Sequence, residues 1–292
     1  MSRTKLILLG TGTPNAEPWA SGPAVAVTVD DKVYLVDFGA GVVRQCTKAF
    51  SMGIEQLNPR NLTVAFCTHL HSDHTTGLAD LIFTPWVLTR NEPLKIYGPK
   101  GMKHMVDCIS DAYKVDVDFR LHGDEQGNEN GYKTDVTEIY NGYVYKDELV
   151  TVEAFTALHG TLECYSFKFT TPDKVIVISG DTCPTQLMVD KAKGCDILLH
   201  EAYYDGGLAQ RAEHWQKYHS SVHTSSVALG KMCNEIKPKQ LITYHRIYHT
   251  MIFDNSINMT KHIKDREYAI LEEIRSVYDG EVYNGQDLDV FV

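Results

Sequence analysis

The sequence predicts an α/β protein, and three observations support that fold class. Short apolar runs of strand length recur along the chain and alternate with loops and helical patterns. Many of these runs end on a residue that can bind metal or form hydrogen bonds, as expected where one site is assembled beyond the strand ends. A chain of 292 residues can also bury a core large enough to fold without disulfides or a structural metal.

The predicted strands follow one another along most of the chain. They cover residues 5–10, 24–29, 32–39, 62–69, 94–99, 149–159, 165–171, 174–181, 196–202 and 240–245. A helix is predicted over residues 223–238, where apolar side chains recur on one face. Thr224 or Ser225 can cap its start, and Pro238 ends it. A second helix is predicted over residues 265–280, closed by a glycine.

One segment departs from this pattern. Residues 119–146 are polar, rich in glycine and asparagine, and contain several tyrosines. We expect a solvated insertion with a short hairpin, and the alternative is a lid or wall of a substrate pocket, because long loops in compact domains often carry function. The rest of the chain is expected to join this insertion in a single domain spanning residues 1–292.

The composition narrows the class of protein. The formal net charge is −10, and no cluster of lysine and arginine marks a track for a phosphate backbone, which argues against nucleic acid without excluding it. The seven cysteines form no Cys-x-x-Cys pair and are expected to be reduced thiols. No run approaches the roughly 18 apolar residues that span a membrane. A cytoplasmic protein is therefore expected.

Residues 67–77, CTHLHSDHTTG, place four candidate metal ligands in six positions directly after an apolar run. On an extended stretch His69 and His71 point to the same side, and Asp73 and His74 follow where the chain turns. Imidazole and carboxylate groups together suit zinc and similar divalent ions. One histidine alone would more often be structural, but this density of ligands predicts a metal site.

Four residues cannot complete two coordination shells, so other segments must contribute. His159, Asp181 and His245 each stand at the end of a predicted strand. Because strand ends gather around a shared site in α/β proteins, their common placement indicates that they belong to the same metal site.

These motifs and their order resemble the metallo-β-lactamase-fold hydrolases. The resemblance is carried by the His-x-His-x-Asp-His signature, by YLVDFGAG before it, and by LHG, SGDT and TYH after it. It implies a four-layer αββα sandwich that holds two divalent ions, with zinc expected first and manganese or iron left open. It also implies the ligands: His69, His71 and His159 for the first ion, Asp73, His74 and His245 for the second, and Asp181 as the bridge. Asp37 is expected to orient one of the ligands.

Such a metal pair predicts a hydrolase that attacks with a metal-bound hydroxide, at carbonyl, phosphorus or sulfur. Asp73 can also take the proton of the nucleophile. Glu201 and His223 lie in stretches that resemble the His-Glu-Ala and His-Ser-Thr motifs of the ribonuclease Z branch, where such a pair assists the leaving oxygen. We expect His223 to donate the proton and Glu201 to orient it. The alternatives are that His223 only caps the following helix, that Glu201 is a surface acid, and that His219 competes for the role.

The resemblance is closest to the branch that contains ribonuclease Z and arylsulfatase-like hydrolases. Bacterial ribonuclease Z carries a long arm that grips transfer RNA between the positions matching His159 and Asp181, and here only 21 residues separate them. This difference and the acidic balance favour a small-molecule ester, with arylsulfatase-type activity the sharpest prediction. A ribonuclease Z-like phosphodiesterase or transfer-RNA 3′ endonuclease is the alternative. A lactonase or other carbonyl hydrolase comes third, and a catalytically silent binding protein is the remaining class.

A substrate pocket with aromatic walls is expected near His223. Trp215, Tyr218 and His219 are its candidates, because their stretch leads directly into that histidine. Whether the protein forms a homodimer is left open.

Overall fold

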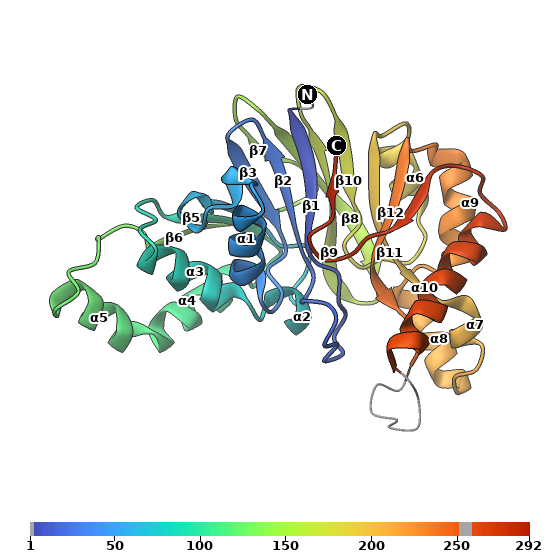
Figure 1. The fold of residues 1–292 in the computed structure, drawn as a ribbon, viewed down its shortest axis with the longest axis horizontal. Coiled ribbons are helices and arrows are strands. Elements are labelled where there is room, and N and C mark those ends of the chain that lie inside the picture. Colours follow the sequence, from blue (N-terminus) through green and yellow to red (C-terminus); the bar gives the residue numbers. More distant parts are fainter. Residues whose placement is uncertain (1–2, 251–258) are drawn as a thin grey trace. The chain divides into compact units, whose positions relative to one another are not determined.

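The computed structural model describes residues 3–250 and 259–292, which divide into two compact units. Unit 1 comprises residues 3–14, 18–140 and 287–292, and unit 2 comprises residues 15–17, 141–250 and 259–286. Each unit is built around one β-sheet with helices beside it (Figure 1). The α/β class is therefore confirmed, whereas the single domain expected from the sequence stays a prediction.

The sheet of unit 1 has the strand order β14-β1-β2-β3-β4-β5-β6. Neighbouring strands from β14 to β3 are antiparallel, and those from β3 to β6 are parallel. Because β3 and β4 are parallel neighbours, the segments that follow them leave the sheet at the same edge. The strands are β1 (Thr4–Gly10), β2 (Ala24–Val29), β3 (Lys32–Val36), β4 (Val64–Phe66), β5 (Leu94–Gly98), β6 (Thr134–Glu138) and β14 (Val290–Phe291).

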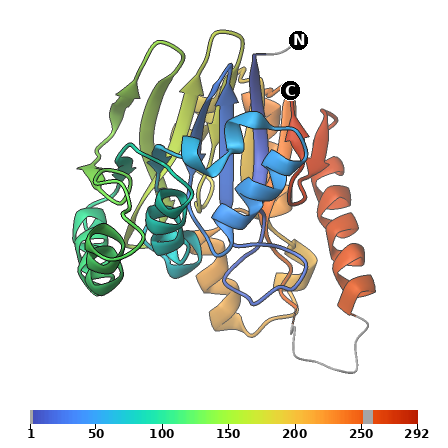
Figure 2. The same cartoon turned by 60° about the vertical axis from the view of Figure 1, so that its left-hand side comes forward.

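Helices of unit 1 pack against its sheet and against one another. Figure 2 shows α1 lying across the strands of this sheet, and α1 turns four closely spaced apolar residues inward at helical spacing. Arg90 is also fully buried, and it donates hydrogen bonds to four main-chain carbonyls. The helices are α1 (Val42–Ser51), α2 (Ser72–Thr75), α3 (Leu78–Val87), α4 (Met102–Ala112) and α5 (Lys114–His122), with short 3₁₀ turns at Glu55–Leu57 and Pro59–Asn61.

The sheet of unit 2 has the strand order β13-β12-β11-β10-β9-β8-β7. Neighbouring strands from β7 to β10 are antiparallel, and those from β10 to β13 are parallel. The carboxyl ends of β10, β11 and β12 therefore meet at one edge. The strands are β7 (Gly142–Lys146), β8 (Thr151–His159), β9 (Leu162–Thr170), β10 (Val175–Ile178), β11 (Ile197–Tyr203), β12 (Gln240–Ile247) and β13 (Val282–Asn284).

Two of the described helices of unit 2, α9 and α10, confirm the two helices predicted from the sequence, whereas α6, α7 and α8 were not predicted. In α9 the Ser225 hydroxyl caps the first turn by accepting a hydrogen bond from the Ala228 N–H at 3.1 Å, and the helix stops just before Pro238. Helix α10 packs beside α9 (Figure 1); it begins earlier than predicted and ends before Gly280. The helices are α6 (Gln186–Ala192), α7 (Asp205–Leu208), α8 (Glu213–Val222), α9 (Ser226–Ile236) and α10 (Met259–Arg275).

The predicted strands are confirmed, but the hairpin expected within residues 119–146 is wrong. That segment starts in the last turns of α5 and then supplies β6 and β7. β6 pairs with β5 in parallel, whereas β7 pairs with β8 in antiparallel, so the two strands join different sheets. Each is an edge strand with few buried residues, which explains why its sequence is polar. Among residues 3–250 and 259–292, no helix combines the length and apolar character needed to cross a bilayer.

Candidate active site

Asp37 organises the ligand candidates of unit 1. It follows β3 with a φ of 60°, a backbone conformation that is uncommon outside glycine and often found at functional sites. Its carboxylate accepts a hydrogen bond from the Thr68 N–H at 2.8 Å and lies 2.8 Å from His74 Nδ1. Because the carboxylate accepts a hydrogen bond from Nδ1–H, the proton of the neutral ring stays on Nδ1 and Nε2 of His74 keeps its lone pair; Nε2 lies 3.5 Å from Asp73 Oδ2.

The backbone around Asp37 packs directly against the signature segment. The N–H of Phe38 donates to the carbonyl of His74 at 3.0 Å. A Cβ added to Gly39 would lie 2.6 Å from the carbonyl oxygen of Asp73, so a larger residue would force the two segments apart. The glycine of the YLVDFGAG motif therefore serves to bring Asp37 within reach of its partners.

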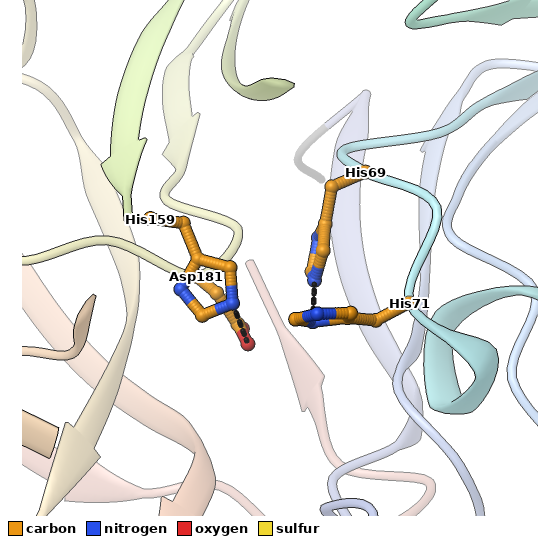
Figure 3. Close-up of side chains that lie close together, drawn as sticks. All are labelled: His69, His71, His159 and Asp181. Atoms are coloured by element: carbon orange, nitrogen blue, oxygen red, sulfur yellow. Dashed lines mark hydrogen bonds and ion pairs between the residues drawn. The ribbon is translucent and has the colours of Figure 1, made fainter. Parts of the chain in front are cut away.

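His69 and His71 present nitrogen atoms to each other. Their Nε2 and Nδ1 atoms are 3.0 Å apart (Figure 3), and Nδ1 of His69 lies 3.0 Å from the Thr68 hydroxyl. The ring of the buried His69 also lies 4.2 Å from that of His74, measured between centroids. The signature segment thus collects several imidazole nitrogens within a few ångströms of one another.

Unit 2 contributes a second set of candidates, centred on Asp181. His159 ends β8, its Nδ1 lies 2.8 Å from the Val222 carbonyl, and its Nε2 lies 3.9 Å from Asp181 Oδ2 (Figure 3). His245 approaches the same carboxylate, with Nδ1 at 3.6 Å from Oδ1. All three side chains are buried. Imidazole and carboxylate groups packed this closely are the donor set that divalent transition metals prefer.

His245 owes its direction to a bulge in β12. Glu201 pairs with Tyr244 and Ala202 pairs with Arg246, so His245 is an extra residue without a place in the ladder. Its φ of 44° is positive, as for Asp37. The bulge breaks the alternation of side chains along the strand and turns this imidazole toward Asp181.

Glu201 and His223 form a buried pair next to Asp181. Nδ1 of His223 lies 2.9 Å from Glu201 Oε1 and 3.9 Å from Asp181 Oδ2. Glu201 is fully buried, and the Thr182 N–H donates to the same Oε1 at 3.0 Å. Burial lowers the pKa of His223, but the charge and hydrogen bond of Glu201 outweigh it, so the net effect is a raised pKa. Glu201 is not a surface acid, and Ser225 rather than His223 caps α9.

The predicted substrate residues lie on α8 and do not all share one surface. Trp215 and His219 line a cavity of about 240 Å³ in unit 2, whereas Tyr218 is not among the residues that line it. The same cavity is lined by Arg211 and His249, which sequence reasoning missed. Neither lies in a recognisable motif, so only the fold brings them to Trp215.

The residues present fit a pair of divalent cations. His74 and His159 each have Nδ1 held by an oxygen acceptor, and each turns Nε2 toward a carboxylate, that of Asp73 for His74 and that of Asp181 for His159. This arrangement fixes the tautomer that leaves a lone pair for metal, and it is the usual outer support of metal-binding histidine.

Fold and donor set together define a metal-dependent hydrolase. The chain belongs to the β-lactamase superfamily, since residues 33–246 match the Beta-lactamase superfamily domain. A ribonuclease Z from Mycobacterium avium (strain 104) is 30% identical over 237 residues, which cover 78% of this chain and 81% of that protein.

Solved structures show the same fold over nearly the full length. The short form of human tRNase Z matches with a TM-score of 0.70 at 21% identity, covering 99% of this chain and 98% of that one. The metallo-β-lactamase fold protein YhfI from Bacillus subtilis matches with a TM-score of 0.70 at 17% identity, covering 99% of both chains. The predicted metallo-β-lactamase fold and ribonuclease Z branch are confirmed. The ranking of arylsulfatase above ribonuclease Z activity is not supported by these relatives.

Proposed function

We propose that this protein is a ribonuclease Z-like phosphodiesterase, which hydrolyses an RNA phosphodiester with the help of two divalent ions. The curated ribonuclease Z relatives support this substrate class. The acidic net charge argued against nucleic acid as a partner, but a total charge does not describe the few side chains that meet a substrate.

The ions would be held by two groups of the ligand candidates described above. The first group is His69, His71, His159 and Asp181, and the second is Asp73, His74 and His245. Asp37 would fix the orientation of His74 through the hydrogen bond described above. A bound metal pair of this kind supplies a water-derived nucleophile near neutral pH and withdraws charge from the scissile group. Zinc is our first choice, because imidazole and carboxylate donors suit it.

The Glu201–His223 pair is the observation that carries the proposal. Glu201 accepts a hydrogen bond from Nδ1 of His223 and its charge raises the pKa of that ring, so the protonated imidazolium is favoured and its Nε2–H can give a proton to a leaving oxygen. A ribose alkoxide leaves poorly without such a proton, whereas an aryl oxide or aryl sulfate leaving group is already stabilised by its ring. A buried proton donor beside Asp181 is therefore more useful for a nucleotide substrate than for an aryl ester.

A small ester is the second candidate, because one feature of the chain favours it. The residues between His159 and Asp181 form only β9, β10 and a turn closed by a hydrogen bond from the Thr171 N–H to the Lys174 carbonyl at 2.9 Å. They leave no room for a long RNA-gripping arm. If RNA is the substrate, other surfaces of the chain must hold it.

A turnover panel on the metal-loaded protein tests the choice between these candidates. The substrates are a precursor transfer RNA, bis(4-nitrophenyl) phosphate, 4-nitrophenyl sulfate and a lactone. We expect cleavage of the RNA and slower turnover of the aryl phosphodiester, with neither sulfate nor lactone hydrolysed. Hydrolysis of the sulfate alone would return the assignment to an arylsulfatase.

The His223→Ala variant tests the role of the dyad. Its kcat should fall by roughly 10²–10⁴-fold on RNA, which needs a proton donor, and by much less on the aryl phosphodiester, which does not. Equal losses on both substrates would mean that His223 supports the structure of the site and does not protonate the leaving group. Glu201→Gln should share the selective loss, because a neutral amide removes the negative charge that raises the pKa of His223.

A further inference from the structure

The cavity in unit 2 is lined by several polar and aromatic side chains that the proposed mechanism does not use. It has a volume of about 240 Å³ and is lined by Arg211, Trp215 and His219 from the α8 region and by His249 after β12. His249 has a φ of 54°, so an uncommon backbone conformation directs its imidazole.

Three buried polar atoms at this cavity have no hydrogen-bond partner among the described residues. They are Nε of Arg211, Nδ1 of His219 and Nε2 of His249. Buried polar atoms are nearly always paired, so three such atoms around one cavity indicate a polar group that completes them. Burial lowers the pKa of His219 to about 4 and that of His249 to about 3, so both imidazoles are neutral near pH 7. Each can then donate at one nitrogen and accept at the other.

The cavity adjoins the leaving-group dyad through a series of aromatic rings. The ring of His219 is stacked on that of His223 with centroids 5.8 Å apart. The ring of Trp215 lies next to that of His219, with their centroids 5.8 Å apart and their planes inclined by 31°. The Trp215 side chain is 41% exposed, so its ring can still receive a flat ligand. A group that accepts a proton from His223 would lie one ring away from this cavity.

We infer that this cavity binds the base of the nucleoside whose oxygen leaves, stacked on Trp215 and hydrogen-bonded by Arg211, His219 and His249. The inference rests on the proposed function and names the part of the substrate that this surface recognises. Two neutral imidazoles and the donors of Arg211 beside an aromatic face match the edge and face of a base. A free inorganic anion fits less well, because the Glu17 carboxylate also lines the cavity. The volume lies below the roughly 300–1,000 Å³ of pockets for drug-sized ligands, which suits one base.

The test compares substrates with and without the base. Trp215→Ala and Trp215→Phe are assayed on a cleavable RNA, on the same RNA with an abasic nucleotide on the leaving side, and on bis(4-nitrophenyl) phosphate. Tyr268→Ala is the matched control, since it removes an aromatic ring that is 63% exposed on α10 of the same unit. Binding of the four nucleoside monophosphates to each metal-loaded protein is measured by calorimetry, independently of turnover.

We expect Trp215→Ala to lower kcat/KM on the intact RNA by roughly ten- to a hundredfold, the range for loss of one base stack. Its effect on the abasic RNA and on the aryl phosphodiester should be small, and Trp215→Phe should recover most of the loss. At least one nucleoside monophosphate should bind to the wild-type and Tyr268→Ala proteins but not to Trp215→Ala.

The two readouts separate this inference from the proposed function. If RNA is cleaved but Trp215→Ala lowers turnover equally on intact and abasic RNA and does not change nucleotide binding, the cavity inference is overturned and the proposed function stands. If no RNA is cleaved but a nucleoside monophosphate binds in a manner that depends on Trp215, RNA hydrolysis fails and the base site is supported.

Discussion

Replacing Asp37 by asparagine should weaken the binding of one metal ion and leave the other nearly unchanged. The carboxylate lies 2.8 Å from Nδ1 of His74 and selects the tautomer with a free Nε2. An asparagine can still accept the Thr68 N–H, but its amide nitrogen can also face His74 and stabilise the opposite tautomer. The change therefore acts on one ligand of one ion.

The size of the effect follows from that contact. A hydrogen bond to a charged group contributes about 1.5–3 kcal/mol, and a tenfold change in affinity corresponds to about 1.4 kcal/mol. The affinity of the second ion should then fall by roughly 10- to 100-fold, which is also the range found when outer-shell partners of metal ligands are removed. The first ion should keep its affinity within a few fold.

The assay is a calorimetric titration of metal-free protein with Zn²⁺, repeated with Mn²⁺. Asp287→Asn is the matched control: Asp287 also lies in unit 1 and accepts hydrogen bonds from Thr11, Ser21 and Gln45, but it contacts no candidate ligand. Circular dichroism confirms that both variants fold. Two ions bound by Asp37→Asn as tightly as by Asp287→Asn would refute the reasoning, and so would the loss of both ions.

Three further predictions concern stability, each measured on metal-free protein. Arg90→Met leaves four main-chain carbonyls without their donor and should lower the free energy of unfolding in urea by more than about 3 kcal/mol, with Arg90→Lys recovering part of it. Ser225→Ala removes the cap of α9 and should cost about 1 kcal/mol in the same assay, whereas Ser225→Asp should cost little. His219 has a pKa lowered from 6.5 to about 4, so the unfolded chain binds a proton first as the pH falls; its stabilising contribution is complete above pH 6.5 and lost toward pH 4. His219→Gln should therefore lose less stability than wild type over that range, and parallel pH profiles would contradict this.

The sequence predicted those parts of the molecule in which local pattern and chemistry agree. The strands leading to Asp37, His69 and Asp181 are apolar runs followed by a residue of a metal-binding type. The apolar pattern and the residue type therefore predict the same elements. The cap at Ser225 was predictable for a similar reason, because a hydroxyl directly precedes an apolar helical face.

Other features depend on tertiary structure and leave little trace in the sequence. Strands β6 and β7 lie at sheet edges, where one polar face suffices and alternation is weak, so their segment resembles a loop. The burial of Arg90 follows from carbonyls on several segments. Arg211 and His249 meet at one cavity only because α8 and the end of β12 pack together.

The bulge at His245 restricts how this protein can vary in evolution. Insertions and deletions are usually tolerated in loops, but a deletion within β12 would remove the extra residue and restore regular alternation, turning the proposed ligand His245 to the opposite side of the sheet. Replacing one apolar residue of β12 by another keeps the length of the strand and does not change the direction of the His245 imidazole. Lineages that diverge in substrate are therefore expected to differ in their loops and to share the residue count of this strand.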